Sequence, residues 1–487
     1  MKRTILATIL IALFGAMATI ATAADRPNIL FCFADDWGWP HAGAYGDPVV
    51  KTPTFDRLAR EGVLFQHAFI SAPSCTPSRN AIITGQQFYR LGPGANLHST
   101  LDVDLPNFMM TLPDAGYKIG HWRKAWGPGN YQIGGYKEHP CGPNSRFDQF
   151  LKRRPKDQPF CFWFGTSDPH RPYAKDTGEK SGMDLSKVHV PEFFPDTKTI
   201  RGDIADYYFE VQRWDSDVAA ALELLDKHGE LDNTIIVMSG DHGFPFPRGK
   251  GNMYDWGSRV PLAIRWGAGV KNPGRTVTDF VSLTDLGPTF LEAAGLPVPK
   301  MMTGRSLVGL LESDRGGRVE PSHDFVVYGR ERHVPAQEIP SMVGYPARAI
   351  RTDGWLYIMN LEPDRWPAGV PDNASHPMTH FADCDNGPTK FFIMKHRDDP
   401  RYARYFELCF AKRPAEELYD CAADPEQVHN LADDPKHAKT KQRLHNRLTD
   451  YLHRTDDPRF TDAEVKFAEY PYTAGYMKPR LEKWREE

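Results

Sequence analysis

The chain lacks an excess of charge of either sign, and it also lacks internal repeats and low-complexity tracts. Its formal net charge is −4 over 487 residues, which provides no basic surface for nucleic acid and no broad attraction to an anionic membrane. Apolar residues make up 40% and charged residues 25%, a globular composition that excludes a disordered or fibrous chain. We therefore expect no nucleic-acid partner, and any site that binds an anion has to be local.

Long apolar runs are absent after the N-terminus. There, Lys2 and Arg3 precede apolar and small residues at 4–20, and residues 21–23 form an A-x-A motif. This pattern predicts a cleaved signal peptide over residues 1–23. The alternative is an uncleaved anchor, because the run approaches the length of a membrane span. We expect an exported protein, periplasmic or secreted, with no stable membrane insertion.

Cysteine is scarce, and its count of seven is odd. Export permits disulfides, but the spacing does not choose among the possible pairings. Cys409 and Cys421 are near each other in sequence and form one candidate pair. An odd count leaves at least one thiol unpaired, so Cys75 is available for another role.

Apolar runs that alternate with helical patterns predict an α/β fold. Residues 28–36 read "NILFCFADD" and residues 233–243 read "NTIIVMSGDHG", as in strands that are buried on both faces. Residues 203–228 place apolar side chains on one face of a helix that Gly229 ends. Residues 52–69 predict a short helix, stopped at Gly62, and a further strand. We expect a large, mostly parallel sheet sandwiched by helices.

A second, smaller domain is expected after a passage rich in Gly, Pro and charge at 299–346. We place a catalytic domain at residues 24–345 and an α+β domain at 346–487. Residues 347–360 predict a hairpin with Asp353-Gly354 at its turn, which gives this second domain an antiparallel sheet.

Acidic side chains follow two of the predicted strands. Asp35 and Asp36 end the first, and Asp241 and His242 end a later one. Ligands of open α/β sheets bind outside the carboxyl ends of the strands, and adjacent carboxylates are costly unless a cation or protons neutralise them. Three Asp side chains suit Ca²⁺ before Mg²⁺, whereas His242 is the least typical ligand of this set. The alternative is that such pairs only form turns or helix caps.

The segment "CTPSRNAIITG" at 75–85 predicts a helix that starts near Cys75. Pro77 suits its first turn and Gly85 its end. Cys75 then lies at the positive end of the helix dipole, where free amides favour an anion, and Arg79 can direct donors to the same place. The alternative is a buried cysteine that acts as a small apolar residue.

Together these segments resemble the type I sulfatases of the alkaline-phosphatase-like superfamily. The run Cys75-Thr76-Pro77-Ser78-Arg79 matches their signature, in which a maturation enzyme oxidises the cysteine to formylglycine, whose hydrate is the nucleophile. "RPNILFCFADDWG" and "SGDHG" match the two metal-binding strands of the family. The resemblance implies that the metal ligands are Asp35, Asp36, Cys75, Asp241 and His242.

Three further segments of the family carry catalytic side chains. "GTSDPHRPY" resembles the segment that supplies a catalytic histidine, here His170. "GYKIGHWRKAWGPG" places Lys124 at the family's lysine position, and "RGKGNMYDWGSRVPLAIR" places Lys250 at a further sulfate-binding cation. Within the family the chain is most similar to the heparan N-sulfatase (sulfamidase) branch.

The chain departs from the family pattern at two positions. Trp126 stands where relatives have a histidine that hydrogen-bonds the nucleophile, and Arg123 replaces a glycine. Either another side chain, such as His98 or His121, takes over the role of that histidine, or this active site is arranged differently.

We expect an exported sulfatase whose substrate is a sulfated oligosaccharide or polysaccharide. Four side chains are candidates to hold a sugar carboxylate or a second sulfate: His98, Arg171, Arg332 and His333. The open alternatives are a phosphodiesterase or phosphonate monoester hydrolase of the same superfamily, and a non-catalytic glycan-binding protein.

Overall fold

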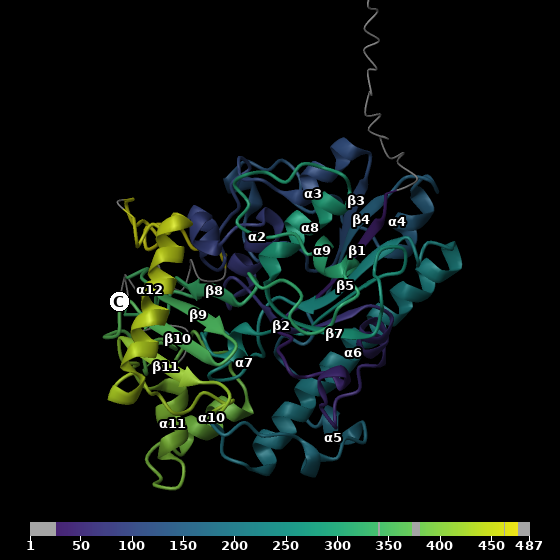
Figure 1. Ribbon diagram of the computed structural model, residues 1–487. Helices are drawn as coiled ribbons and strands as arrows, with labels where there is room; N and C mark the ends of the chain where they lie inside the picture. The colour runs from purple at the N-terminus through teal and green to yellow at the C-terminus, as the bar shows by residue number, and fades with distance from the viewer. Residues whose placement is uncertain (1–25, 339–340, 373–379, 462, 476–487) are drawn as a thin grey trace, which may run out of the picture.

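The computed structural model describes residues 26–338, 341–372, 380–461 and 463–475, and it contains two β-sheets that lie next to each other (Figure 1). The predicted signal peptide at residues 1–23 lies outside the described residues. None of the helices within the described ranges is both long and apolar enough to cross a bilayer.

The larger sheet has seven strands and is mostly parallel, as predicted. In spatial order they are β3 (Lys118–Trp122), β4 (Phe160–Gly165), β1 (Asn28–Ala34), β5 (Thr234–Gly240), β6 (Leu262–Trp266), β2 (Val63–Phe69) and β7 (Arg275–Ser282). Within this sheet, β6 runs antiparallel to both neighbours. β1 pairs in parallel with β4 on one side and with β5 on the other, so the carboxyl ends of β1 and β5 come together.

Helices cover both faces of the large sheet, and others accompany the small sheet. The helices of the described residues are α1 (Pro53–Glu61), α2 (Cys75–Thr84), α3 (Phe108–Thr111), α4 (Phe147–Arg153), α5 (Thr177–Lys180), α6 (Lys198–His228), α7 (Asp255–Ser258), α8 (Leu286–Ala293), α9 (Val308–Glu312), α10 (Pro388–Lys395), α11 (Ala403–Phe410) and α12 (Ala438–Arg454). Along β1, Leu30 and Cys32 pack on the face covered by α6. Phe31 and Phe33 pack on the opposite face, against α8 and its neighbours. Alternate side chains of a strand point to opposite faces, so β1 is apolar throughout because both faces are buried.

The long helix α6 begins at Lys198, earlier than the predicted 203. The hydroxyl of Thr197 accepts a hydrogen bond from the amide of Ile200 and caps the first turn, a signal that lies outside the apolar pattern. The C-terminal end agrees with the prediction, since Gly229 has a φ of +68° and ends the helix in the left-handed conformation that glycine adopts without strain.

The smaller sheet is antiparallel, with the order β11-β10-β9-β8. Its strands are β8 (Phe325–Arg330), β9 (Ala347–Thr352), β10 (Trp355–Asn360) and β11 (Glu416–Asp420). The predicted hairpin is confirmed, with Asp353 and Gly354 between β9 and β10. The division of the chain at residue 346 stays a prediction; β8, which precedes that point, belongs to this sheet.

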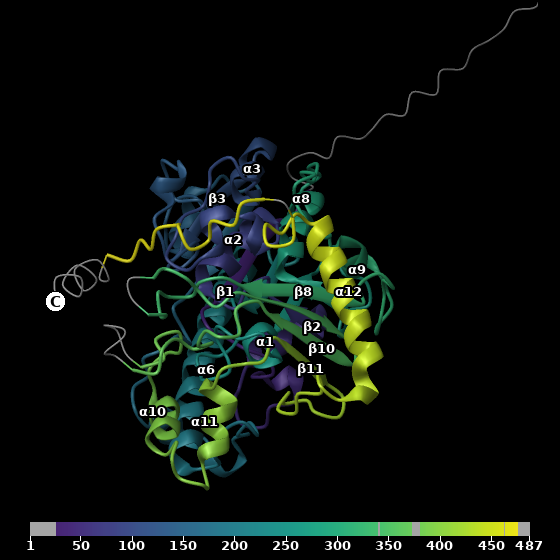
Figure 2. The ribbon, with the colours of Figure 1, turned by 90° about the vertical axis from the view of Figure 1, so that its left-hand side faces the viewer.

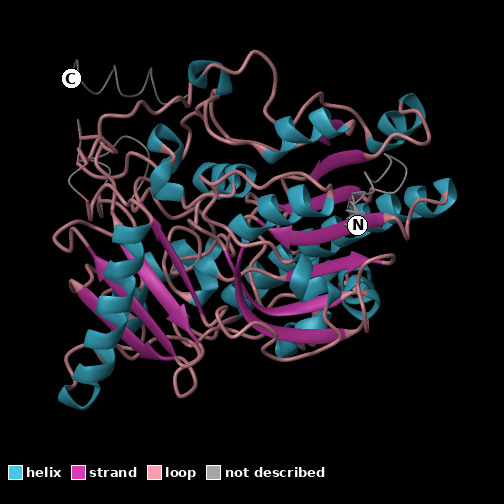
Figure 3. Cartoon of the chain, turned by 45° about the horizontal axis from the view of Figure 1, so that its top comes forward, coloured by secondary structure: helices cyan, strands magenta, loops and turns pink. Residues whose placement is uncertain are grey.

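One helix lies across the small sheet, and two lie near α6 (Figures 2 and 3). In both views α12 lies across the strands of the small sheet. Its Leu444, Leu448 and Leu452 pack against strand side chains that include Ile350 and Tyr357. α10 contacts α6, and α10 and α11 lie together below the sheet in Figure 2. The second domain therefore packs along the first.

The proposed pairing of Cys409 with Cys421 is wrong, since both are free thiols. Cys409 lies in α11, in the core that includes α6, and its thiol donates to the carbonyl of Phe193 at 3.5 Å. Cys421 follows β11, packs against a different apolar cluster and accepts a contact from Gln427. Nearness in sequence does not bring these two thiols together because the elements that carry them pack into separate cores.

A buried ion pair joins the two sheets. Asp255 of α7 accepts from Arg351 of β9 through both oxygens, at 2.9 and 3.0 Å, and Arg259 lies 3.5 Å away. Burial would raise the pKa of Asp255, but the two guanidinium groups lower it from 3.8 to about 2. Because a buried carboxylate without its partner is costly, this pair holds the small sheet in place.

We expect Asp255→Asn to lower the free energy of unfolding by about 3 kcal/mol at pH 7, because Arg351 is left without its bidentate partner. A depressed carboxyl pKa stabilises the fold above the unfolded pKa, and this contribution is lost as the pH falls from about 4 toward 2. Urea unfolding at pH 7 and pH 3 checks both points. Equal stability of the variant and the parent at pH 7 would contradict the assignment.

Candidate active site

The two acidic strand ends meet at one edge of the large sheet. Ala34 of β1 pairs with Gly240 of β5, so the residues that follow them leave the sheet side by side. The amide of Asp36 donates to Asp241 Oδ1 at 2.9 Å. Asp36 has a φ of +73°, a left-handed conformation that Asp tolerates better than most side chains do. The expected convergence of the two strand ends is therefore present.

Cys75 lies at the same place, as the first residue of α2. Its Sγ is 3.4 Å from Asp35 Oδ1 and 3.3 Å from His242 Nε2, and only 3% of the residue is exposed. Burial raises the pKa of the Cys75 thiol well above its ordinary value, although the Lys124 ammonium opposes this. The unmodified side chain is therefore a neutral thiol and a poor nucleophile.

Four side chains of the predicted metal set fit a divalent cation. Asp35, Asp36, Cys75 and His242 each present one ligand atom, and these atoms all lie within 4.8 Å of one another. Asp36 Oδ1 is buried without a hydrogen bond, with His242 Nε2 3.1 Å away. A buried carboxylate oxygen left in this state is costly, so the donor set is suited to a cation. Carboxylate oxygens favour a hard ion, and the imidazole also suits a transition metal.

Asp241 lies against this set with both oxygens engaged. Its Oδ1 accepts from the Asp36 amide, and its Oδ2 accepts from Arg79 Nε at 2.8 Å. His242 Nε2 is 3.5 Å from Oδ1. Asp241 is thus in the predicted position, and its role as a metal ligand stays a prediction.

Arg79 lies beneath the carboxylates and is fully buried. Besides Asp241, its guanidinium group donates to the carbonyl of Ala125 at 2.6 Å, and one Nη lies 3.6 Å from Asp35 Oδ1. Arg79 lies beside carboxylates of the cluster that includes Cys75, and its role toward an anion at Cys75 stays a prediction. These contacts also make Arg79 a structural tie between α2, β1 and the segment after β3.

Two lysines approach the carboxylates from other segments. Lys124 Nζ is 2.6 Å from both oxygens of Asp35. Lys250 Nζ is 3.1 Å from Asp36 Oδ2 and 3.1 Å from Asp385 Oδ2. Burial would raise the pKa of Asp35, but Lys124 and other cations hold it well below its ordinary value. For Asp36 burial prevails and raises the pKa.

His170 lies at the mouth of the cluster, with 34% of its side chain exposed. Its Nε2 is 3.9 Å from Asp36 Oδ2, and its Nδ1 lies 2.6 Å from the carbonyl of Arg171. Since a carbonyl only accepts, Nδ1 carries a proton and Nε2 is the nitrogen that faces the cluster. His170 is therefore placed to exchange a proton with a molecule that enters the site.

The four candidate substrate-binding residues differ in position. His333 lies beside the cluster, because its Nδ1 is 2.8 Å from the hydroxyl of Ser74, the residue before Cys75. Burial, and then the charge of Lys250, hold the pKa of His333 well below its ordinary value. The His98 amide donates to Thr76 Oγ1.

The two arginines of that group are bound to the protein itself. Arg171 forms a bidentate ion pair with Asp203, with both distances 2.9 Å. Arg332 donates to the carbonyls of Met342 and Tyr470. The structure does not bring either guanidinium group into the cluster, because each satisfies buried acceptors elsewhere.

Trp126, which stands in place of the family histidine, belongs to the core. Its indole donates to Asn80 of α2 and packs against Tyr131. His121 directs Nδ1 to the carbonyl of Gly142 at 2.9 Å and stacks on His139. These contacts do not support the hypothesis that His121 replaces the family histidine that hydrogen-bonds the nucleophile. The histidine that contacts the nucleophile position is His242.

Asp385 is a residue of this cluster that the sequence analysis missed. It lies just before α10, far along the chain from the other acids, and its carboxylate contacts Lys250. The available signal was the acid-rich run "ADCDNGP" at 382–388, which has the composition of a loop. Only the packing of the second domain against the first reveals its place.

Comparison with known proteins agrees with this geometry. The family model described as Sulfatase matches residues 27–152 and 144–296. The chain belongs to the sulfatase family. The human N-sulphoglucosamine sulphohydrolase is 30% identical over 480 residues, covering 89% of this chain and 91% of that protein. An ulvan-active sulfatase of Formosa agariphila is 30% identical over 437 residues, covering 86% and 78%. The protein is thus a sulfuric ester hydrolase, and the predicted family is confirmed.

Solved structures confirm the alkaline-phosphatase-like fold of this sulfatase. A protein in complex with D-glucosamine-2-N,6-O-disulfate superposes with a TM-score of 0.64 at 20% identity, covering 89% of this chain and 98% of that one. The phosphonate monoester hydrolase of Agrobacterium radiobacter gives a TM-score of 0.60 at 19% identity, covering 88% and 96%. At these identities the likeness shows the fold alone.

We expect Lys124→Ala to impair catalysis more than folding, and Arg79→Ala to impair both. Both variants should lose on the order of 10²–10³-fold in kcat on a sulfate ester, as when a charge-stabilising donor is removed. Arg79→Ala should also lower the melting temperature markedly, since it leaves Asp241 unpaired in the interior. Lys124 is partly exposed and should cost little stability. Kinetics and thermal unfolding measured side by side check this, and full activity of either variant would refute its role.

Proposed function

We propose that this chain is an exported sulfatase that removes sulfate from a sulfated carbohydrate, using a formylglycine formed from Cys75 and a divalent cation. The observation that carries the proposal is the position of Cys75 at the start of α2, in contact with Asp35 and His242. The relatives support the substrate class, because one is named for N-sulphoglucosamine and another for ulvan.

The chemistry at position 75 calls for a modified side chain. The buried, neutral thiol is a poor nucleophile. An aldehyde in its place would supply a hydrate whose first hydroxyl attacks sulfur and whose second later expels sulfate. Ca²⁺, before Mg²⁺, would supply positive charge that lowers the pKa of that hydrate, held by Asp35, Asp36 and His242.

The remaining steps belong to side chains of this chain. Asp241, held between Arg79 and the Asp36 amide, accepts the proton of the attacking hydroxyl. Lys124 and Lys250 exchange their carboxylate partners for sulfate oxygens and stabilise the charge that develops there. His170, at the mouth of the cluster, acts as general acid when Nε2 as well as Nδ1 is protonated, and gives the Nε2 proton to the departing oxygen or nitrogen.

Export and maturation follow from the same proposal. The N-terminal pattern with Lys2, Arg3 and the A-x-A motif supports transport to the periplasm or outside the cell. A formylglycine-generating enzyme is then a required partner. A phosphonate monoester hydrolase shares the fold, but the family match and the more similar relatives favour sulfate over phosphonate.

The direct test is desulfation by protein with a confirmed aldehyde. Mass spectrometry of the peptide that contains residue 75 should show loss of the thiol after expression with the maturation enzyme. We expect release of sulfate from a panel of N-sulfated glucosamine and ulvan oligosaccharides, and little turnover of an aryl phosphate diester or phosphonate. Cys75→Ala is the matched inactive control. Turnover of the diester or phosphonate alone would replace this proposal with the rival reaction.

Removal of the divalent cation should affect both activity and stability. Without it, the negative charges of Asp35 and Asp36 are opposed only by neighbouring side chains. We expect a chelator to abolish desulfation and to lower the melting temperature, and added Ca²⁺ to restore both. Asp36→Asn should show no stabilisation by Ca²⁺. An unchanged melting curve and activity after verified metal removal would contradict the proposed site.

A further inference from the structure

The partly exposed carboxylate of Asp385, on the loop before α10, lies beside the cluster. Asp385 Oδ2 lies 3.1 Å from Lys250 Nζ, which is equally close to Asp36. The carboxylates of Asp385 and Asp36 and the imidazole of His170 present atoms within 4.8 Å of one another. Unlike Asp36, which is fully buried, Asp385 has 27% of its side chain exposed. It therefore stands on the same open side of the site as His170.

Hydrogen bonds from Lys390 hold the loop that carries Asp385. The ammonium group of Lys390 donates to the carbonyls of Phe381 and Cys384 and to the side chain of Asn386, at 2.7 to 3.0 Å. Lys390 is itself buried. Three acceptors within six residues of this loop bind one ammonium group, so the conformation of the loop is fixed by these hydrogen bonds.

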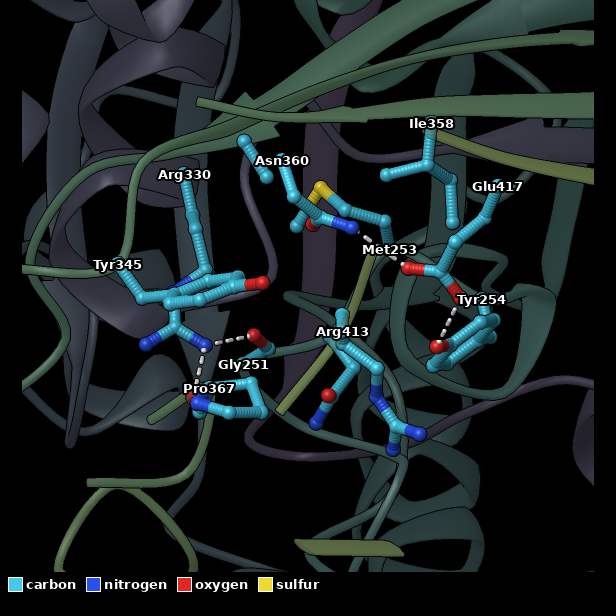
Figure 4. A pocket seen from close by; sticks show the side chains of 12 residues that line it. Gly251, Met253, Tyr254, Arg330, Tyr345, Ile358, Asn360, Pro367, Arg413 and Glu417 are labelled. Atoms are coloured by element: carbon cyan, nitrogen blue, oxygen red, sulfur yellow. Dashed lines mark hydrogen bonds between the residues drawn. The ribbon is translucent and has the colours of Figure 1, made fainter. Parts of the chain in front are cut away.

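A second anchor ties this loop to Lys250. Arg330 of β8 donates to Asp383 Oδ2 at 2.7 Å and to the carbonyls of Gly251 and Pro367, as Figure 4 shows. Gly251 directly follows Lys250. One guanidinium group thus holds both the backbone beside Lys250 and the loop that bears Asp385, which keeps these two side chains in contact.

The same loop forms part of the wall beside the nucleophile position. Ala382 packs against the apolar cluster that contains Cys75 and Val334. A group that approaches Cys75 therefore passes a surface to which this loop contributes. The negative charge of Asp385 therefore lies beside Lys250 and His170, on the side of the cluster where His170 is partly exposed.

We propose that Asp385 is a charge-selecting residue, which disfavours doubly charged groups at the site and leaves singly charged sulfate groups as substrates. A sulfate monoester carries one negative charge, whereas a phosphate monoester carries nearly two above pH 7. A fixed carboxylate several ångströms away repels the second charge. This repulsion should favour the singly charged group over the doubly charged one by about tenfold or more. The inference rests on the proposed function, and it extends to substrates: a sugar with a hydroxyl or amine beside the scissile sulfate fits better than one with a second anion there.

The test separates the charge of Asp385 from the size of its side chain. Asp385→Asn and Asp385→Ser remove the charge, Asp385→Glu retains it, and Asp398→Asn makes the same change at a side chain that is 93% exposed. Two readouts are taken at pH 8: kcat/KM for 4-nitrophenyl sulfate and 4-nitrophenyl phosphate, and calorimetric binding of inorganic sulfate and phosphate. Melting temperatures show that each variant is folded.

We expect both neutral variants to shift the preference on the order of tenfold toward phosphate, in turnover and in binding. Asp385→Glu and Asp398→Asn should keep the preference of the parent. An equal change for the sulfate and phosphate ligands would overturn the inference, because Asp385 would then act only by positioning Lys250. Failure of the parent protein to turn over any sulfate ester would refute the proposed function instead, and the binding measurements would still decide the role of Asp385.

Discussion

The structure depends on the neutralisation of the carboxylates that the large sheet brings close together. Because β1 and β5 are parallel neighbours, Asp35, Asp36 and Asp241 leave the sheet at one point, where all three are buried. Such a group is stable only if positive charge surrounds it. Arg79, Lys124 and Lys250 come from three separate segments to provide that charge. The cations that make the fold possible are therefore those available to hold an anionic group.

These cations are not equivalent. Arg79 is fully buried and binds backbone carbonyls as well as Asp241, so it serves the packing of α2 against the sheet at the same time as the site. Lys124 and Lys250 bind carboxylates through their ammonium groups, and a flexible lysine can exchange one oxygen partner for another. The site thus combines one cation fixed by several acceptors with two cations that can change partners.

The small sheet and the segments that flank it complete the site from one side. Strand β8 supplies Arg330, the segment after it supplies His333 beside Ser74, and the loop before α10 supplies Asp385. The Asp255–Arg351 pair and the loop anchored by Lys390 hold these parts against the large sheet. The chemistry at Cys75 thus relies on the strand ends of the large sheet, whereas the surroundings that a substrate meets also include segments that accompany the small sheet.

Local patterns in the sequence determined the strands β1 and β5, the start of α2, the end of α6 at Gly229 and the small-sheet hairpin. Each of these depends on periodicity or on turn residues within a short window. The same windows carry Cys75, Arg79 and the acidic pairs, so the centre of the site followed from the parallel sheet rule. The tertiary structure alone decided that Arg171 and Arg332 bind internal acceptors, that Trp126 belongs to the core, that Cys409 and Cys421 remain apart, and that Asp385 meets Lys250. Those outcomes depend on which surfaces of separate segments pack together, such as Trp126 with Asn80 at a separation of 46 residues and Asp385 with Lys250 at 135. No short stretch of sequence contains that information.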